Sequence, residues 1–348
     1  MNIFTVEGYI NIPLILKEFE EYPFIFMVGA RGVGKTYGAL EYVYKEKIKF
    51  MYMRRLGTEY DNIQKPEMSP FKPINKDYHA DITTSPIAKG VSGFYHSEMN
   101  EKGKIVPVGD YIGLLTALAT FANIRGFDMS DIDIVLFDEF IPEVQVRRTI
   151  KNEGMALFNA LETIGRNREL KGEKPLKLLA MANSNNMANE IFVELGIVRE
   201  AEKLIRSGKL YYADKAKGLV LIYIRNSPIS EKKASTALYK LTTDSPFAEM
   251  ALDNKFVDYT TRYIKKVNLK EYNPLVSIGE LTIYEHKSDY TYYATKFKKG
   301  APDKYENSEV ERARFSRNFS ELFIAYIDKR LYFEDYASQV LFEKYIGK

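Results

Sequence analysis

The sequence contains no cysteine, and this absence removes several classes of site at once. Disulfides, cysteine-ligated zinc, iron–sulfur clusters and thiol catalysis all need a thiol that the chain does not supply. Tryptophan is absent too, and the three histidines (His79, His96 and His286) lie far apart in the sequence. A metal site built from cysteine or histidine is therefore not expected.

Long hydrophobic runs are also missing. No stretch approaches the ~18 uninterrupted apolar residues that would predict a membrane span. Residues 1–22 carry acids and no basic leader, so they do not have the pattern of a signal peptide. These features predict a soluble intracellular protein with no membrane partner.

A large excess of one charge is missing as well. Lys and Arg number 50 against 47 Asp and Glu, which leaves a net charge of +3. Any nucleic-acid contact is therefore expected to come from local patches rather than from overall charge. With 45% hydrophobic and 28% charged residues, the composition is that of an ordered globular protein.

The pattern of apolar residues predicts a parallel α/β sheet. Short continuous apolar runs are typical of strands buried on both faces, and helical spacing separates them. Strands are predicted at 24–28, 49–53, 132–137, 176–182 and 219–225, and helices at 10–22, 36–47, 114–122, 155–168, 187–206, 231–241 and 247–252. Such alternation of strands and helices is the signature of an α/β fold.

The length of 348 residues predicts two domains, or one domain with a modest addition. We expect a main α/β domain over residues 1–210, a linker region over 211–256 and a second domain over 257–348. In the second domain the alternation at 281–287 and 291–297 predicts an antiparallel pair of strands, and 308–346 predicts one or two amphipathic helices. A hairpin about Asn100–Gly103 is also expected.

The strongest functional signal is a complete GxxxxGKT phosphate loop, Gly29-Ala30-Arg31-Gly32-Val33-Gly34-Lys35-Thr36. It follows a predicted buried strand and opens a helix, which is where its chemistry requires it. Glycines let consecutive N–H groups point at phosphate oxygens, and the helix N-terminus adds positive potential. Lys35 is expected to reach the β- and γ-phosphates, and Thr36 to supply a hydroxyl ligand to Mg²⁺.

The second signal is an apolar strand that ends in two acids, Ile134-Val135-Leu136-Phe137-Asp138-Glu139. This is the Walker B pattern, and its distance from the phosphate loop leaves room for intervening strands. Asp138 is expected to hold Mg²⁺ through water, and Glu139 to orient and polarise an attacking water. The two patterns together predict hydrolysis of ATP.

Two further polar positions have two interpretations each. Arg166, in Arg166-Asn167-Arg168-Glu169, can neutralise charge on the γ-phosphoryl oxygens of a neighbouring subunit, or it can simply cap a solvated helix end. Asn183, just after the strand 176–182, can contact the γ-phosphate or the attacking water, or it can belong to an ordinary turn.

Other basic residues lie near strand ends or in the C-terminal part. Arg31, Arg54, Arg55 and Arg125 are each interpreted as solvated charges that could also touch phosphate or a neighbour. In the C-terminal part, Lys287, Lys296, Lys298, Lys299 and Lys304 alternate with Tyr290, Tyr292 and Tyr293. These could contact a nucleic-acid backbone or form a solvated hairpin face.

Four segments occur together in a recognisable order: the phosphate loop, Tyr52-Met53-Arg54-Arg55, Val135-Leu136-Phe137-Asp138-Glu139-Phe140-Ile141 and Arg166-Asn167-Arg168-Glu169. With Glu249-Met250-Ala251-Leu252-Asp253-Asn254-Lys255-Phe256, they resemble the DNA-packaging motor ATPases of small short-tailed double-stranded DNA bacteriophages, the Picovirinae-type encapsidation proteins. The similarity is dense around the ATPase motifs and sparse after about residue 260.

The resemblance implies a P-loop ATPase domain of the additional-strand, glutamate-class (ASCE) type with a mostly parallel sheet. A small linker and an α+β C-terminal domain would follow, the latter similar to the RNase H-like nucleases of terminases but without their catalytic acids. It further implies a homopentameric ring on the portal vertex of a procapsid in the host cytoplasm, which drives double-stranded DNA inward. A scaffold RNA between ring and portal is left open.

The resemblance also carries residue roles. Lys35 and Thr36 match the phosphate-loop pair, Asp138 the metal-binding acid and Glu139 the catalytic glutamate. Arg166 matches an arginine finger that acts in trans, and Arg125 and Arg168 are further candidates to act across the interface. The sequence departs from the family pattern with Gly165 before the finger and with a longer stretch between Arg55 and Asp138.

Two rival functions remain at this point. One is another ring-forming nucleic-acid motor, such as a helicase or helicase loader. The other is a nucleic-acid-binding scaffold that binds nucleotide without hydrolysis, although such a protein would have no use for Glu139. A nuclease in the C-terminal domain is a residual alternative, but no pair of neighbouring carboxylates there predicts a two-metal site.

Overall fold

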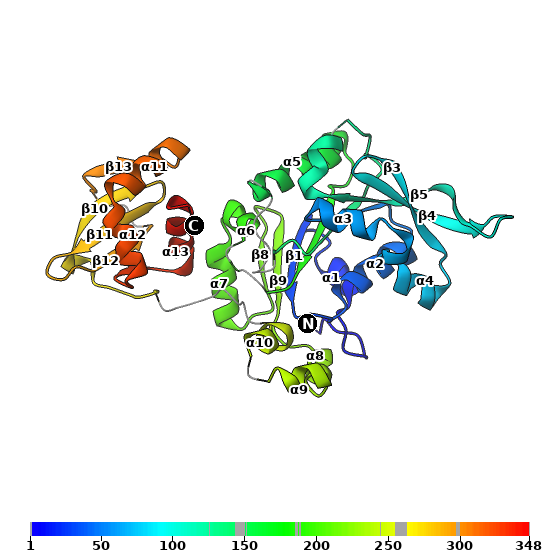
Figure 1. The fold of residues 1–348 in the computed structure, drawn as a ribbon, viewed down its shortest axis with the longest axis horizontal. Coiled ribbons are helices and arrows are strands. Elements are labelled where there is room, and N and C mark those ends of the chain that lie inside the picture. The colour runs from blue at the N-terminus through cyan, green and yellow to red at the C-terminus, as the bar shows by residue number, and fades with distance from the viewer. Residues whose placement is uncertain are drawn as a thin grey trace. The chain divides into compact units, whose positions relative to one another are not determined.

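The structure is a computed structural model, and it describes residues 2–124, 126–142, 150, 152–184, 187, 189–243, 245–254, 263–296 and 300–347. The chain divides into two compact units (Figure 1). The first unit comprises Met1–Leu195 with Leu204–Val257, and the second comprises Gly196–Lys203 with Asp258–Lys348. Each unit has a hydrophobic core of its own. No helix among the described residues is long and apolar enough to cross a membrane.

The first unit is built on a nine-stranded sheet. Its strands are β1 (Phe24–Gly29), β2 (Phe50–Arg54), β3 (Ile82–Ala88), β4 (Val91–Met99), β5 (Ile105–Ala117), β6 (Ile134–Asp138), β7 (Lys177–Ala182), β8 (Tyr211–Asp214) and β9 (Leu219–Ile224). Their order is β3-β4-β5-β2-β6-β7-β1-β9-β8. The strands from β5 to β9 in this order run parallel, and β3, β4 and β8 are antiparallel to their neighbours. The predicted largely parallel α/β sheet is therefore confirmed.

Helices cover both faces of the sheet at β1. The helices up to residue 254 are α1 (Ile12–Glu18), α2 (Lys35–Lys45), α3 (Gly57–Ile63), α4 (Lys72–Tyr78), α5 (Glu153–Gly165), α6 (Glu190–Leu195), α7 (Val198–Ser207), α8 (Pro228–Ala234), α9 (Ala237–Leu241) and α10 (Pro246–Asp253), with 3-10 turns at Pro66–Met68, Leu118–Ile124 and Arg168–Lys171. Ile25 and Met27 of β1 pack in one core cluster with residues of α1 and α2. Phe26 faces the opposite side, where its ring lies 6.1 Å from that of Phe192 in α6. This double burial explains the continuous apolar run of β1.

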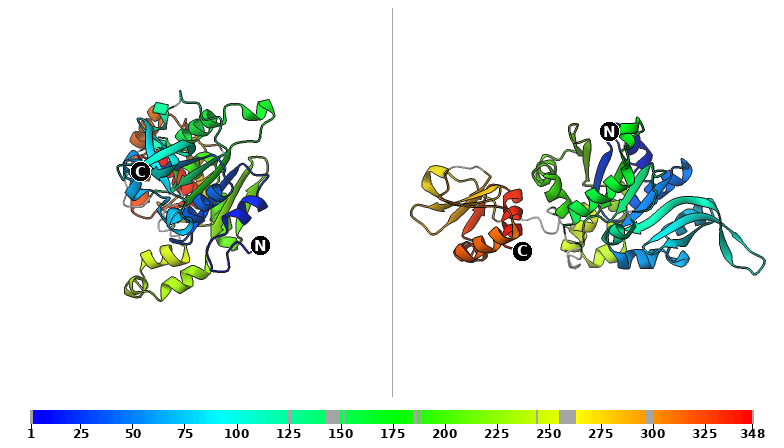
Figure 2. Two further views of the ribbon diagram at one scale, coloured as in Figure 1. Left: turned by 90° about the vertical axis from the view of Figure 1, so that its right-hand side faces the viewer. Right: turned by 90° about the horizontal axis from the view of Figure 1, so that it is seen from above.

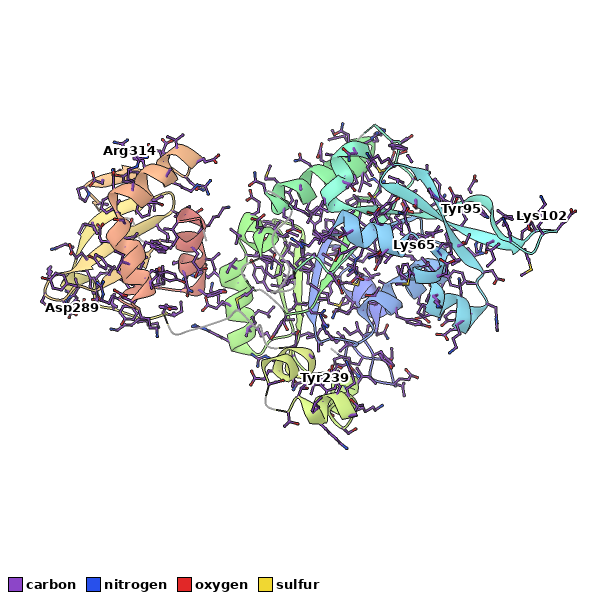
Figure 3. The ribbon with its side chains drawn as sticks, in the orientation of Figure 1. Lys65, Tyr95, Lys102, Tyr239, Asp289 and Arg314 are labelled. Carbon is purple, nitrogen blue, oxygen red and sulfur yellow. The ribbon has the colours of Figure 1, made fainter. Side chains whose placement is uncertain are left out.

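The segment between β2 and β6 contains an antiparallel addition to the sheet. Strands β4 and β5 continue beyond the sheet as a two-stranded ribbon, with Lys102 at its tip and Tyr95 nearer its base (Figures 2 and 3). The turn is closed by the Gly103 amide, which donates to the Asn100 carbonyl at 2.9 Å, so the hairpin predicted there is confirmed. The helix predicted at 114–122 is wrong over Leu114–Ala117, which pair with β2 as the end of β5, whereas 118–122 lie in the 3-10 turn Leu118–Ile124.

Residues 211–254 belong to the first unit and are not a separate linker. Strand β9 pairs in parallel with β1 along its whole length, from Phe24 opposite Leu219 to Gly29 opposite Ile224. The apolar run of β9 is therefore part of the central sheet, and the linker predicted at 211–256 is wrong over its strands. Helices α8, α9 and α10 follow β9 as a small helical lobe, and Tyr239 lies within it (Figure 3).

The helix predicted over 187–206 is two helices, α6 and α7.

Among the described residues after 263, the second unit combines a five-stranded mixed sheet with three helices, and the first part of α7 belongs to it as well. Its elements are β10 (Tyr272–Ile278), β11 (Leu281–His286), β12 (Tyr292–Thr295), β13 (Asp303–Tyr305), α11 (Glu309–Asn318), α12 (Ser320–Ile327), β14 (Leu331–Phe333) and α13 (Tyr336–Tyr345), with a 3-10 turn at Leu269–Glu271. The strand order is β13-β10-β11-β12-β14. The predicted antiparallel pair is present as β11 and β12. The one or two helices predicted at 308–346 are three helices and a strand, because β14 interrupts them and pairs with β12.

Candidate nucleotide site

The phosphate loop connects β1 to α2, as its sequence position predicts. Gly32 and Gly34 have positive φ angles of 68° and 90°, which favour glycine over any other residue. A Cβ on Gly34 would lie 3.2 Å from side-chain atoms of Tyr9, so this turn also has little room for a side chain. The two glycines therefore fix a tight loop at the N-terminus of α2, where backbone amides and the helix dipole favour an anion.

Lys35 is buried beneath this loop. Its Nζ donates to the carbonyls of Gly29 and Ala30 at 2.8 Å each, and to Oδ1 of Asn183 at 3.1 Å. Burial lowers the pKa of Lys35 to about 7, against the opposing effect of the nearby Asp138 and Glu139 carboxylates. A buried cation held by carbonyl oxygens gains a charged partner when a phosphate enters the loop.

Asp138 ends β6 beside the start of α2. Its Oδ2 accepts hydrogen bonds from Thr36 Oγ1 at 3.0 Å and from the buried Tyr52 hydroxyl at 2.7 Å. Desolvation, followed by the Asp138 charge, raises the pKa of Tyr52 well above its ordinary value. Tyr52 therefore stays a hydroxyl donor, and it orients the carboxylate toward Thr36.

Glu139 follows Asp138 in a left-handed backbone conformation, with φ of 55°. Its side chain is 44% exposed, and Arg54 Nη2 contacts its Oε2 at 2.5 Å. The same guanidinium contacts Asp138 Oδ2 at 3.3 Å and Glu59 Oε1 at 3.4 Å. Desolvation alone would lower the pKa of Arg54, but Tyr52 and the surrounding carboxylates raise it, so the residue is a permanent cation between the acids.

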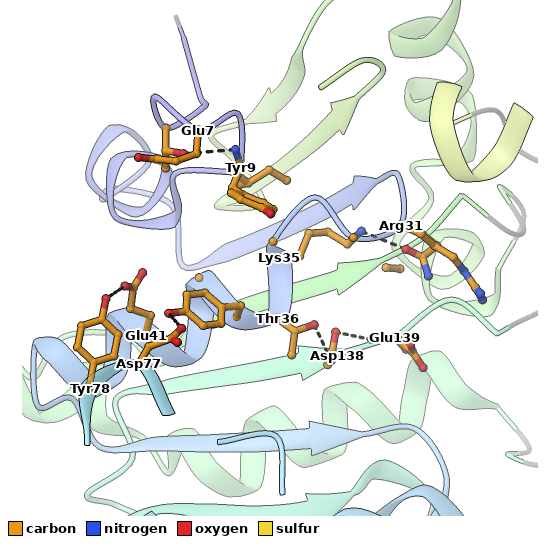
Figure 4. Close-up of a pocket in the computed structure, with 18 residues that line it drawn as sticks. Glu7, Tyr9, Arg31, Lys35, Thr36, Glu41, Asp77, Tyr78, Asp138 and Glu139 are labelled. Atoms are coloured by element: carbon orange, nitrogen blue, oxygen red, sulfur yellow. Dashed lines mark hydrogen bonds between the residues drawn. The ribbon is translucent and has the colours of Figure 1, made fainter. Parts of the chain in front are cut away.

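A cavity of about 1130 Å³ lies at the phosphate loop and the two acids that follow it in space, Asp138 and Glu139 (Figure 4). The phosphate loop, Asp138, Glu139 and Asn183 form one part of its wall. Three tyrosines, Tyr9, Tyr37 and Tyr78, form another part. The cavity thus joins a polar part suited to a polyphosphate with a part where tyrosines lie among the acids Glu7, Glu41 and Asp77.

The oxygens at the polar end fit Mg²⁺. Thr36 Oγ1 and Asp138 Oδ2 lie 3.0 Å apart, and a hydroxyl with one carboxylate is a usual protein contribution to a magnesium ion that also binds phosphates. The residues expected at 36 and 138 are therefore brought together, as are Lys35, Glu139 and Asn183, which line the same cavity.

The candidate trans-acting arginines lie elsewhere. Arg166 does not line the cavity; its guanidinium donates to the Phe127 carbonyl at 2.6 Å and contacts Asp128, with 39% of its side chain exposed. Arg168 is buried and donates to the carbonyls of Ser130 and Ile132 at 3.0 and 2.8 Å. Arg168 therefore anchors the segment that contains Ser130 and Ile132, and its role across an interface stays a prediction. Arg125 lies outside the described residues.

Three residues of the site differ from the sequence interpretation or were missed by it. Arg54 and Arg55 were interpreted as solvated charges, and this is wrong. Arg54 binds both acids of β6, and Arg55 forms a buried ion pair with Glu153 at 2.5 Å. Tyr52 was not expected at the site at all. Tyr52 and Arg54 reach the acids because β2 and β6 are adjacent, which places their carboxyl ends side by side. Arg55 does not line the cavity and instead pairs with Glu153 of α5.

The fold and the site together define a P-loop nucleotide-binding protein with an additional strand, since β7 lies between the phosphate-loop strand β1 and the acid-bearing strand β6. The family model described as Podovirus DNA encapsidation protein (Gp16) matches residues 17–284. The chain belongs to this family.

Individual relatives agree with this assignment. The DNA packaging protein of Bacillus phage B103 is 29% identical over 247 residues, which are 69% of this chain and 66% of that protein. The DNA packaging protein of Bacillus phage phi29 is 27% identical over 247 residues, or 69% of this chain and 64% of that protein. The chain thus spans less than two thirds of the length of these curated relatives.

Two solved structures share the fold. The structure of the bacteriophage phi-29 viral genome packaging motor assembly matches 99% of this chain and 98% of its own, with a TM-score of 0.65 and 18% identity. The phi-28 gp11 DNA packaging motor matches 96% of this chain and 97% of its own, with a TM-score of 0.63 and 20% identity. The similarity therefore extends over both units of the chain.

Proposed function

We propose that the chain is an ATP-hydrolysing motor that moves double-stranded viral DNA into a procapsid. Membership of the encapsidation family supports the packaging role. The observation that carries the hydrolytic part is that Glu139 lines the same cavity as Lys35, Thr36 and Asp138. A carboxylate at this place is needed for attack by water, whereas a protein that only binds nucleotide does not need it.

The chemistry follows from the residues around the cavity. The loop amides and Lys35 bind the β- and γ-phosphates and stabilise the charge that develops on them. When bound by Thr36 and Asp138, Mg²⁺ would neutralise further phosphate charge. Glu139 orients the attacking water and accepts its proton, and Asn183 contributes its amide beside the terminal phosphate.

We propose in addition that the protein acts as a homo-oligomeric ring, a pentamer by the family resemblance, on the portal vertex of a procapsid in the host cytoplasm. Arg166 supports this, because it lies on the surface away from its own cavity and suits an arginine finger for a neighbour. The C-terminal unit is proposed to be an RNase H-like domain without nuclease activity. A scaffold RNA and the role of Arg125 are further candidate features of the ring.

The proposal is tested by steady-state phosphate release with procapsids, with and without double-stranded DNA. Stimulation by intact duplex that weakens with added salt is expected, because a packaging motor grips DNA through its phosphates. Hydrolysis that needs forked DNA and unwinds it would instead identify a helicase. Nucleotide binding without any phosphate release would identify a scaffold, and cleavage of linear DNA with Mn²⁺ would identify an active nuclease.

A further inference from the structure

A lysine of the helical lobe α8–α10 reaches the phosphate loop from outside its own sequence motif. Lys233, near the end of α8, is half-buried, and its Nζ donates to the Arg31 carbonyl at 2.6 Å. It is more than 200 residues distant in sequence, so nothing in the phosphate-loop pattern predicts it. The contact places an ammonium group on the turn of the loop.

The Lys233 ammonium lies close to Gly32. A Cβ built on Gly32 would lie 2.7 Å from Lys233 Nζ, so the ammonium occupies the space beside the turn. Gly32 itself has a φ of 68°, a conformation that the loop needs in order to direct its amides inward. Lys233 therefore lies against the residues that shape the anion-binding turn.

Neighbouring contacts hold Lys233 in this place. Its Nζ lies 5.3 Å from the centre of the Tyr239 ring, which is itself buried in the lobe. Ser227 caps α8, since its Oγ accepts from the Ser230 amide at 3.2 Å. At the far end of the lobe, Asn254 Nδ2 donates to the Val28 carbonyl at 3.2 Å, immediately before the loop. The lobe is thus attached to the loop at Arg31 and to the end of β1 at Val28.

The charges at the loop point to an anion. Lys233 and Arg31 lie close enough to Lys35 to contribute to its lowered pKa, after the larger effect of burial. The Asp138 and Glu139 carboxylates act on Lys35 in the opposite direction. Positive charge from Lys233 and Arg31 beside a turn of inward backbone amides favours an anionic ligand on that side of the loop. A polyphosphate is the ligand that the proposed function supplies.

We propose that Lys233 is a positioning residue of the nucleotide site, which holds the turn of the phosphate loop through the Arg31 carbonyl and adds positive charge beside the bound polyphosphate. This inference rests on the proposed function. Lys233 contacts the turn that binds the phosphates shared by ADP and ATP, so its loss is expected to lower the affinity for both nucleotides equally. Loss of a residue that contacts the γ-phosphate would lower the affinity for ATP alone.

The test compares the affinity of full-length Lys233→Met, Lys233→Arg and Lys232→Met for fluorescent ADP and for a non-hydrolysable ATP analogue. Methionine keeps the length of the side chain and removes the charge and the donor, and arginine keeps both. Lys232 is the matched control, because it is the adjacent lysine and its Nζ contacts the Glu7 carbonyl at 3.2 Å instead of the loop. Thermal unfolding of all variants shows whether the fold is retained.

The expected result is a loss of affinity of about tenfold for both nucleotides in Lys233→Met, the usual worth of a hydrogen bond to a charged group. The affinities of Lys233→Arg and Lys232→Met for both nucleotides should stay within about threefold of those of the wild type. Binding by Lys233→Met that equals the wild type, or a loss shared by Lys233→Arg or Lys232→Met, would overturn this inference alone. Absence of nucleotide binding by the wild type would overturn the proposed function with it.

Discussion

Arg54 at the end of β2 holds Glu139 at the end of β6, with 2.5 Å between Nη2 and Oε2. In this arrangement the carboxylate proposed to direct the attacking water is engaged by a cation of its own chain. The same guanidinium also contacts Asp138. Under the proposed function, Glu139 has to exchange this partner for water before it can direct the attack, so we expect the ion pair to restrain the basal rate of hydrolysis.

Arg54→Met is expected to release Glu139 and to raise hydrolysis in the absence of DNA relative to the DNA-stimulated rate. The ratio of stimulated to basal phosphate release should fall about threefold or more, a change of at least ~0.6 kcal/mol in relative barrier height. Glu59→Gln is the control. It removes the charge of another carboxylate that contacts Arg54, at 3.4 Å, and it leaves the Arg54–Glu139 pair in place. An unchanged ratio in Arg54→Met would show that the ion pair does not restrain Glu139.

Tyr52→Phe is expected to weaken Mg²⁺ binding, and so to raise the Mg²⁺ concentration needed for half-maximal hydrolysis, while the loop continues to bind nucleotide. The variant removes the 2.7 Å hydrogen bond that orients Asp138, and loss of such an outer contact usually costs about tenfold or more in metal affinity. The measurement is the Mg²⁺ concentration for half-maximal hydrolysis. Tyr60→Phe is the matched control, because its buried hydroxyl pairs with Ser92 instead. An equal shift in the two variants would contradict the role given to Tyr52.

The buried pair of Arg55 and Glu153 predicts a non-additive effect on stability. Their side chains are 3% and 4% exposed, so Arg55→Met alone leaves a buried carboxylate without this partner and should cost about 3–5 kcal/mol. The double variant Arg55→Met with Glu153→Met should be more stable than Arg55→Met. Urea unfolding followed by circular dichroism measures the difference, and additive losses would contradict the ion pair.

Arg166 and Arg168 are expected to behave differently in mixed rings. Arg166→Ala subunits and Glu139→Gln subunits are each expected to be inactive alone, but a mixture should recover phosphate release, because a finger from one subunit serves the intact site of another. Arg168→Ala should instead lower the thermal unfolding temperature, since its guanidinium anchors the Ser130 and Ile132 carbonyls. Assembled mixtures without any recovery would argue against action in trans.

The parts of the site that could be predicted from sequence are those that a short segment carries by itself. The phosphate loop is eight consecutive residues whose glycines determine the backbone, and Gly32 and Gly34 have the positive φ angles that this requires. The acids at the end of β6 follow an apolar run that only a buried strand explains. The local sequence is therefore enough to predict both the phosphate loop and the acids that follow the strand.

The missed residues depend on the order of strands in the sheet. Met53 of β2 lies opposite Phe137 of β6, so Arg54 reaches the acids only because these two strands are neighbours. Lys233 depends in the same way on the path of the chain after β9. Neither relation leaves a local signal in the sequence, and each arginine or lysine resembled a solvated charge.

The errors in secondary structure have a similar cause. The segment around Leu114–Ala117 has residues of high helix propensity, but a place between β2 and β4 outweighs that preference. Residues 211–254 follow the predicted main domain in sequence, yet β9 completes the sheet beside β1. In both segments, pairing with strands that are distant in sequence determines the secondary structure.

The central claim is that a nucleotide in this cavity is hydrolysed by water that Glu139 directs. The most direct measurement is phosphate release by Glu139→Gln, with nucleotide binding measured on the same preparation. We expect nucleotide affinity within about threefold of the wild type and hydrolysis at least ~100-fold slower, as loss of a general base requires. Turnover at the wild-type rate in a variant that binds nucleotide normally would contradict this account.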